Sequence, residues 1–187
     1  MKVKPTPNRG RVVVELKPGD EKLMAKSKPE VKEQLWPFPI KNILVPVDFS
    51  DYSKQALQYA VPLAEKLGAV VTLLHVVEPR IYPENLVLPL EAEDVNSRLM
   101  KDGQDMLESL RREELDADVT SVSMVTLGKP FQQIIDTAKS MHADLIIIAT
   151  HGYTGLKHVL LGSTAERVVR HAPCPVLTVR MPEHKPA

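Results

Sequence analysis

A glycine-rich stretch, residues 149–163 with the sequence ATHGYTGLKHVLLGS, holds the residue types in this chain that are best suited to chemistry. It follows DLIII (144–148), an aliphatic run with the composition of a buried strand. Gly152 would let the backbone turn with positive φ and let a ligand approach the amides closely. Gly162 and Ser163 come at the start of the next predicted helix, where free N–H groups and the helix dipole favour phosphate. The stretch therefore predicts a cradle for a phosphorylated ligand.

The spacing of these residues leaves a second interpretation open. The glycines could only shape a tight connection, while Ser163, which has capping-box spacing to Glu166, caps the helix. The stretch lacks the lysine of G-x-x-x-x-G-K-[ST] and does not match G-x-G-x-x-G, so neither familiar phosphate motif is present. His151 could contact a phosphate or only shape the loop. The stretch by itself does not decide between a ligand site and a turn.

The elements that must position this stretch alternate regularly along the chain. Apolar runs predict five strands separated by four helical patterns, which implies a parallel sheet covered on both faces. The strands are expected at 42–47, 69–79, 118–128, 144–150 and 174–180. The fold class is therefore α/β, an open five-stranded parallel sheet of order 3-2-1-4-5 with helices on both faces (Rossmann-like). Ligands of such sheets bind beyond the carboxyl ends of the strands, where the strand order reverses.

Two of the predicted helices carry specific expectations. The first starts after Ser50, which can cap it, and stops at Gly68, with a kink or local break at Pro62. The second runs roughly from Glu91 to Leu115. Its apolar face is expected to contain Val95, Leu99, Met106 and Leu110.

The N-terminal region differs from the rest of the chain in composition. Residues 1–39 contain nine Lys and Arg against five Asp and Glu, and six of the 16 prolines. Such a segment buries little apolar surface, so we expect a partly disordered extension. RVVVEL (11–16) has strand composition and could pair with a sheet edge of this chain or of a partner. Residues 40–182 then form one domain, and 183–187 form a tail.

Whole-chain composition excludes several classes of function. Lys plus Arg and Asp plus Glu both number 24, and this zero net charge argues against a nucleic-acid groove or a polybasic membrane anchor. The apolar runs are too short to span a bilayer, and the first residues lack the apolar segment of a signal peptide. A single cysteine fits a reducing compartment. We expect a soluble cytoplasmic protein.

Three segments together carry a resemblance to a known family. ILVPVDFSDYSKQAL, VTLLHVVEP and ADLIIIATHGYTGLKHVLLGSTAERVVRHAPCPVLTVR agree in order and spacing with the universal stress protein (UspA-like) family, over nearly all of residues 40–180. The resemblance is to the nucleotide-binding subgroup, whose members carry G-x2-G-x9-G-[ST]. This chain has A-x2-G-x9-G-S, with Ala149 in place of the first glycine. Alanine adds one methyl group, which weakens the inference of ATP binding without removing it.

The resemblance implies ATP as the ligand, and Mg²⁺ could arrive with the triphosphate. Gly152, Gly162, Ser163 and the amide of Thr164 would hold the phosphates, and Asp48 would lie near the ribose and base. The adenine side would be formed by Pro46, Val47, Val76, Ile148 and Ala149.

Some of these residues also have purely structural interpretations. Asp48 could make an Asx-type bond in the turn before the first helix. His75, inside an apolar strand, is best read as a hydrogen-bonded core histidine, and Cys174 as a buried, inert thiol. No dedicated metal site and no catalytic residues are predicted, because no convincing ligand spacing or nucleophile–base set is present.

The sequence thus predicts a stress-response protein that binds an adenine nucleotide and acts as a nucleotide-dependent signalling dimer. Any ATP hydrolysis or autophosphorylation would be slow. The family implies a homodimer through antiparallel pairing of the edge segment Val176–Val179. The alternative is a dimeric interaction module of the same fold that binds no nucleotide. An enzyme of the related α-hydrolase group would need a Gly/Ser-rich loop after the first strand, which VPVDFSDYS (45–53) does not offer.

Overall fold

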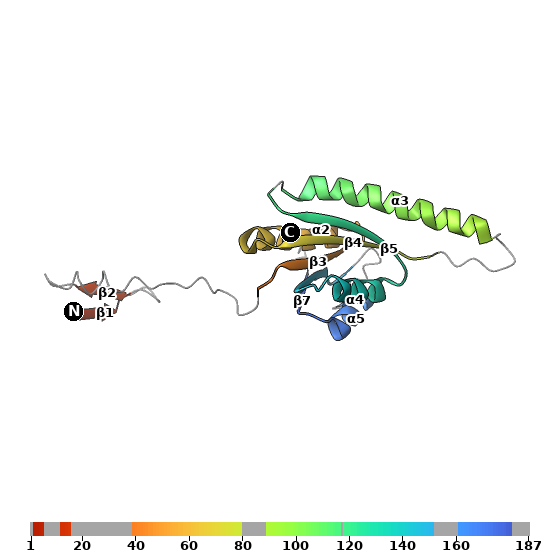
Figure 1. Ribbon diagram of the computed structural model, residues 1–187. Coiled ribbons are helices and arrows are strands. Elements are labelled where there is room, and N and C mark those ends of the chain that lie inside the picture. Colours follow the sequence, from red (N-terminus) through yellow and green to blue (C-terminus); the bar gives the residue numbers. More distant parts are fainter. Residues whose placement is uncertain are drawn as a thin grey trace, which may run out of the picture. The chain divides into compact units, whose positions relative to one another are not determined.

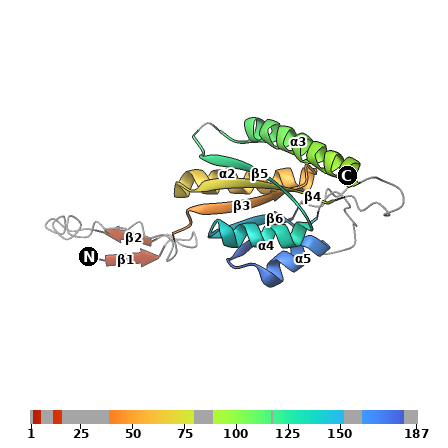
Figure 2. The ribbon, with the colours of Figure 1, turned by 45° about the vertical axis from the view of Figure 1, so that its right-hand side comes forward.

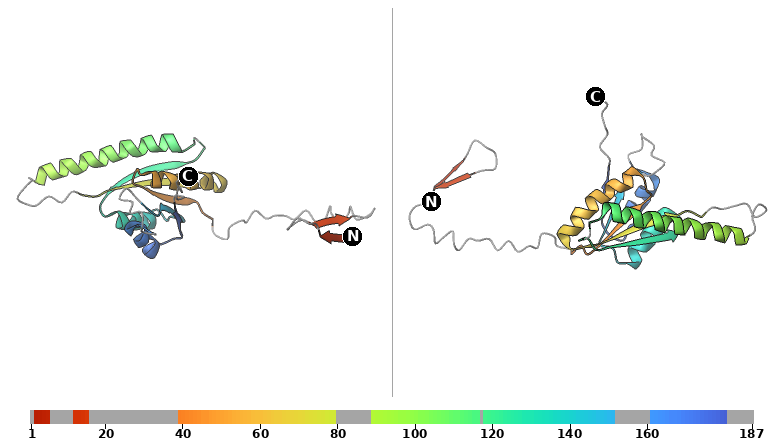
Figure 3. Two further views of the ribbon diagram at one scale, coloured as in Figure 1. Left: turned by 180° about the vertical axis from the view of Figure 1, so that it is seen from behind. Right: turned by 90° about the horizontal axis from the view of Figure 1, so that it is seen from above.

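The computed structural model describes residues 2–5, 12–15, 39–79, 89–116, 118–151 and 161–180. The chain divides into two compact units, residues 1–38 and residues 39–187. In the first unit, β1 (Lys2–Pro5) and β2 (Val12–Glu15) form an antiparallel pair, drawn as adjacent arrows in Figure 3. β2 falls within the run that has strand composition. The division into extension, domain and tail stays a prediction, and the tail lies outside the described residues.

The second unit is built on a five-stranded sheet with the order β5-β4-β3-β6-β7. Its strands are β3 (Asn42–Val47), β4 (Val70–Val77), β5 (Ser121–Leu127), β6 (Leu145–Ala149) and β7 (Val176–Val179). Every neighbouring pair is parallel. Counted within this unit, the order is 3-2-1-4-5, which confirms the predicted fold class. The central strand β3 has β4 on one side and β6 on the other, so the order reverses between β3 and β6.

Four helices cover the two faces of this sheet. They are α2 (Asp51–Leu67), α3 (Pro89–Glu114), α4 (Pro130–Ser140) and α5 (Ser163–His171). Figure 1 and Figure 2 show α2 and α3 on one face and α4 and α5 on the other, in agreement with the two apolar clusters they form. None of the helices described combines the length and apolar composition needed to cross a bilayer.

The strands supply side chains to both apolar clusters by alternation. In β3, Ile43, Val45 and Val47 pack toward α2 and α3, whereas Leu44 packs toward α4 and α5. These strand residues are nearly inaccessible to water. A strand buried on both faces must be apolar at every position, and that explains why the sequence shows continuous apolar runs rather than alternation.

Helix α2 begins and ends where the sequence predicts. The Ser50 side chain accepts a hydrogen bond from the Ser53 N–H at 3.3 Å, and Gly68 closes the helix with φ of 63°. Of the kink or local break expected at Pro62, the break was wrong, because the helix continues through this residue to Leu67. Pro62 is exposed, and so is Gln58, whose carbonyl loses its partner, so water can replace the missing N–H.

One residue of the apolar face predicted for α3 was wrong. Met106 is 52% exposed, whereas Leu107 is fully buried and Leu110 is 4% exposed. The inward stripe runs through Gly103, Leu107 and Leu110 with helical spacing, and Met106 lies outside it. Figure 3 shows α3 lying along β5, which it covers together with part of β4.

Candidate functional site

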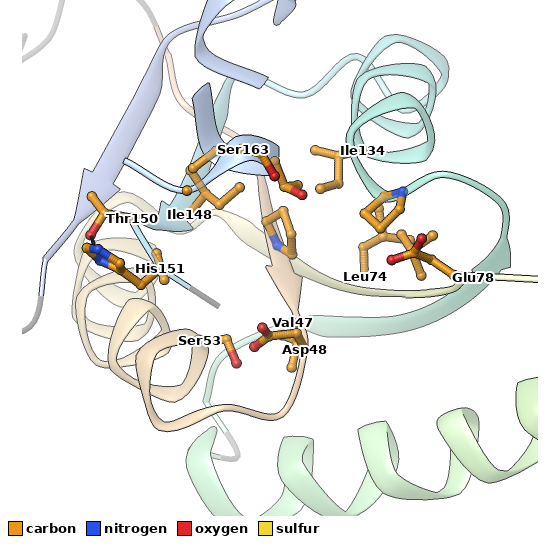
Figure 4. Close-up of a pocket in the computed structure, with 17 residues that line it drawn as sticks. Val47, Asp48, Ser53, Leu74, Glu78, Ile134, Ile148, Thr150, His151 and Ser163 are labelled. Atoms are coloured by element: carbon orange, nitrogen blue, oxygen red, sulfur yellow. Dashed lines mark hydrogen bonds between the residues drawn. The ribbon is translucent and has the colours of Figure 1, made fainter. Parts of the chain in front are cut away.

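A cleft of about 290 Å³ opens at the carboxyl ends of β3, β4 and β6, next to the N-termini of α4 and α5. It spans the place where the strand order reverses, which is the expected ligand position in such sheets. The cleft is drawn in Figure 4, with Asp48 and Ser163 on opposite sides and with Glu78 far from His151. The carboxyl ends of three strands and the N-termini of two helices therefore lie around one opening.

Most of the residues expected to bind nucleotide line this cleft. They are Pro46, Val47, Asp48, Val76, Ile148, Ala149, Gly162, Ser163 and Thr164. The remaining one, Gly152, lies outside the described residues. The structure thus brings together residues separated by more than 100 positions in the sequence, while their role as ligand contacts stays a prediction.

Asp48 lies at the end of β3 and lines the cleft. Its side chain follows those of Leu44 and Pro46 on the same side of the strand, because side chains alternate between faces. Its Oδ1 accepts hydrogen bonds from the Ser50 N–H at 3.1 Å and from the Ser50 hydroxyl at 2.5 Å. This is the Asx-type turn anticipated as the structural interpretation. The two interpretations of Asp48 are compatible, since the turn holds the carboxylate at the wall of the cleft.

The start of α5 lies on the opposite wall. Gly162 is the N-cap residue and Ser163 is the first helical residue, with no side-chain capping bond. The predicted capping box was therefore wrong: Ser163 lies one position too late, and Glu166 pairs with Arg170 at 3.0 Å instead. The first turn of an α-helix has N–H groups without acceptors inside the helix, together with the positive end of the dipole. The cleft thus has a wall suited to an anion.

Gly162 also joins this wall to the end of β6. Its N–H donates to the Thr150 carbonyl at 2.7 Å, and a Cβ at this position would lie only 3.1 Å from that oxygen. Its φ is −66°, so the close approach of the two backbones, rather than an unusual dihedral angle, explains the glycine. A larger residue here would push the α5 N-terminus away from Thr150.

Several further residues line the cleft, and of these only His151 had been considered as a phosphate contact. They are Ser53, Leu74, Glu78, Pro130, Ile134, Thr150, His151 and Ala165. Leu74 and Glu78 share one side of β4 with Val76, so the two-residue period of a strand could have identified them. Pro130 and Ile134 come from α4, and no local sequence signal places that helix beside the cleft.

The charges and polar groups of the cleft are distributed unevenly. Asp48 and Glu78 are carboxylates, and no Lys or Arg is among the lining residues that the structure describes. His151 places its Nδ1 3.0 Å from the Thr150 hydroxyl, and its ring centroid lies 5.6 Å from that of Tyr52. An anionic ligand would therefore be met chiefly by main-chain amides and by cations from solution.

The remaining candidates for chemistry lie elsewhere. His75 is half-buried and bonded to a backbone carbonyl, as expected for a core histidine. Burial and, to a smaller extent, the negative charge of Asp144 raise the pKa of the Cys174 thiol, which fits an inert residue. Within the described ranges, no three His, Cys, Asp or Glu residues gather as metal ligands would.

Comparison with known proteins places this domain among characterised folds. The model of the universal stress protein family matches residues 39–180. Universal stress protein MJ0531 of Methanocaldococcus jannaschii is 35% identical over 145 residues, which is 76% of this chain and 84% of that protein. The solved structure of MJ0577 from the same organism superposes with a TM-score of 0.68 at 28% identity, covering 78% of this chain and 99% of that one.

A further solved structure shares the fold at lower identity. It is a universal stress protein in complex with cAMP, with a TM-score of 0.52 and 19% identity, covering 76% of this chain and 98% of that chain. At this level of identity the likeness concerns the fold alone.

Proposed function

This chain belongs to the universal stress protein family, and we propose that it binds an adenine nucleotide, with ATP as the expected ligand, in the cleft between β3 and β6. The observation that carries the proposal is the pairing, in one cleft, of a helix N-terminus with an apolar slot. A nucleotide needs both features, because its phosphates are anionic and its base is flat and largely apolar.

The phosphate end of the ligand is assigned to the start of α5. Ser163 and Thr164 line the cleft in the first turn of this helix, where amides lack acceptors within the helix. Gly162 holds this turn against Thr150. Gly152, expected to contribute from the stretch before α5, lies outside the described residues, so its part is an expectation from the resemblance.

The base and ribose are assigned to the ends of β3 and β4. Pro46, Val76 and Ile148 give the cleft apolar walls that suit a purine ring. Asp48 adds an acceptor that could bond the ribose hydroxyls or a base N–H. Ala149 stands where the family motif has its first glycine, and the residue as a whole is 8% exposed, so little of the added methyl group can meet a ligand.

Electrostatics suggest that Mg²⁺ assists a triphosphate. The described cleft residues supply two carboxylates and no Lys or Arg, so the added charge of a triphosphate needs another counter-ion. Mg²⁺ characteristically binds through phosphates with few protein ligands. A protein of the same fold has been solved with cAMP, which carries a single phosphate. ATP binding should therefore depend on Mg²⁺ much more than AMP binding does.

We also propose that the chain forms a homodimer through the outer edge of β7. The Val179 and Pro175 carbonyls bond to β6, so Val176 and Thr178 direct their backbone groups outward, away from the sheet. Leu177 is 40% exposed on this strand, and an exposed apolar edge favours pairing. The nucleotide would set the state of such a dimer in a stress response.

Nucleotide binding is tested by calorimetric titration of the full chain with ATP, ADP and AMP, with and without Mg²⁺. Mass spectrometry of any ligand released from undialysed protein would identify what the cleft carries. Gly162→Val should weaken binding by at least about tenfold, since a branched side chain would collide with the Thr150 carbonyl and displace the amides. A wild-type protein that binds no nucleotide under these conditions would favour the interaction-module alternative.

The dimer is tested by sedimentation of a variant that alters only the outward backbone. Thr178→Pro removes an N–H that does not bond to β6, so it should give a folded monomer. Thr178→Val is the matched control and should remain dimeric. A dimeric Thr178→Pro protein would place the interface elsewhere.

A further inference from the structure

We propose that His75 is a positioning residue that fixes Asp48 in the cleft by holding the residues on both sides of it. The inference rests on the proposed function, because Asp48 matters here as a ligand contact. His75 itself does not line the cleft. It lies on β4, directly opposite Val47 in the β3–β4 register.

The first contact is a hydrogen bond to the residue before Asp48. The His75 Nδ1 lies 2.9 Å from the Val47 carbonyl oxygen. A carbonyl oxygen only accepts hydrogen bonds, so Nδ1 must carry the proton. The bond therefore fixes one ring orientation and one protonated nitrogen, and it anchors the last carbonyl of β3, immediately before the peptide of Asp48.

The second contact is with the residue after Asp48. Phe49 has a φ of 63°, a left-handed conformation that is unusual for a bulky side chain. Its ring centroid lies 4.5 Å from that of His75, with the two ring planes inclined at 44°. Strained backbone of this kind persists only where its surroundings hold it in place. The His75 ring supplies such support, so both neighbours of Asp48 depend on one side chain.

The far side of His75 is closed by α3 and β5. A Cβ on Gly103 of α3 would lie 3.0 Å from His75 Cδ2 and 3.6 Å from a methyl carbon of Val125. Glycine inside a helix is unfavourable, and this close approach accounts for it. The imidazole is thus confined between α3, β5 and the end of β3. Because the ring is confined, it keeps one orientation and supports the end of β3 at the wall of the cleft.

Two substitutions separate the two contacts. His75→Asn keeps a donor close to the Nδ1 position and loses the ring, whereas His75→Phe keeps a ring beside Phe49 and loses the donor. We expect His75→Phe to weaken ATP binding by roughly tenfold, the scale of coupling between contacting residues, and His75→Asn to restore part of that loss. His171→Asn is the matched control, because the Nδ1 of exposed His171 also lies 2.9 Å from a backbone carbonyl, that of Arg167.

A double-mutant cycle with Asp48→Ala distinguishes positioning from general loss of structure. If His75 acts through Asp48, His75→Phe should weaken binding strongly in the wild type and by less than about twofold in the Asp48→Ala background. Equal losses in both backgrounds would overturn the proposal. The ¹⁵N shifts of the His75 ring supply a readout that needs no ligand, and they should show a protonated Nδ1. An unprotonated Nδ1 would equally overturn it.

The same set of variants separates failure of this inference from failure of the proposed function. Wild-type binding that His75→Phe leaves unchanged would overturn the positioning role and leave nucleotide binding intact. A wild-type chain that binds no ATP would overturn the proposed function. In that case the ligand-free crystal structure of His75→Phe decides the positioning role: a displaced Asp48 carboxylate supports it, and an unmoved carboxylate overturns it.

Discussion

The two faces of the sheet are covered to different extents. On one face, α2 and α3 have 17 and 26 residues. On the other, α4 and α5 have 11 and 9 residues, and their N-termini stop beside the carboxyl ends of the strands. The cleft opens over this second face. Adjacent residues of β6 therefore differ: Ile147 belongs to the closed core, whereas Ile148 lines the cleft.

Strand β6 gives the strongest test of this comparison. Ile147 is fully buried in the closed α2–α3 face, so Ile147→Ala should lower the free energy of unfolding by about 2–5 kcal/mol. The ATP affinity of the folded protein should change by less than about twofold, since Ile147 itself does not line the cleft. Denaturant unfolding and calorimetry measure the two quantities.

The neighbouring residue should show a different balance. Ile148 is 5% exposed and lines the cleft, so Ile148→Ala should lose less stability than Ile147→Ala and weaken ATP binding by roughly three- to tenfold. The same two measurements apply. If both variants changed affinity equally, the functional difference between the two faces would be refuted.

Gly103→Ala tests whether a packing change on the α2–α3 face alters ligand binding in the cleft through His75. In an open helix this change would stabilise the protein by about 0.5–1 kcal/mol. Here the new Cβ would lie 3.0 Å from His75 Cδ2, so we expect no gain in stability. The ATP affinity should fall by roughly threefold. A full gain in thermal stability with unchanged affinity would show that His75 adjusts freely.

Ser163→Ala separates capping from ligand binding on the open face. Because the Ser163 side chain makes no capping bond, the free energy of unfolding should stay within about 0.5 kcal/mol. ATP affinity should fall by roughly threefold if the hydroxyl bonds a phosphate, which corresponds to a modest hydrogen bond. A stability loss above about 1 kcal/mol would restore the capping interpretation.

The smallest effect is expected from Glu108 on α3. The Arg111 side chain donates to its carboxylate at 2.9 Å and holds the pKa of Glu108 below its ordinary value. The stabilisation is present above the unfolded-state pKa of about 4.3 and is lost as pH falls through the lowered folded-state pKa. Glu108→Gln should reduce the loss of unfolding free energy at acidic pH by less than about 1 kcal/mol, since the pair is partly exposed. Nucleotide affinity at neutral pH should not change.

Local patterns were enough to predict much of the fold. The continuous apolar runs of β3 and β6 indicate strands buried on both faces, and Ser50 and Gly68 mark the ends of α2. The same patterns failed where one residue decides the outcome. Met106 lies one step outside the inward stripe of α3, and Ser163 lies one step inside α5. Apolar spacing and capping motifs do not resolve a shift of one residue, because neighbouring registers share nearly the same pattern.

The candidate site was partly readable from sequence because β3, β4 and β6 end at one edge of the sheet. Parallel strands bring their carboxyl ends together, so Asp48 and Ala149 could be assigned to one opening before any contact was known. Val76 was assigned through the family resemblance. The contribution of α4 could not be assigned, since Pro130 and Ile134 reach the cleft only through packing on β4.

The sequence by itself determined the order of the elements, the parallel sheet and the strand ends that carry polar residues. These follow from short-range patterns of apolar residues, glycines and caps. Only the tertiary structure decided that α3 approaches His75 closely, that His75 contacts both neighbours of Asp48, and that Gly162 approaches Thr150. Those contacts join residues distant along the chain, and their geometry is set by the packing of whole helices and strands rather than by local preference.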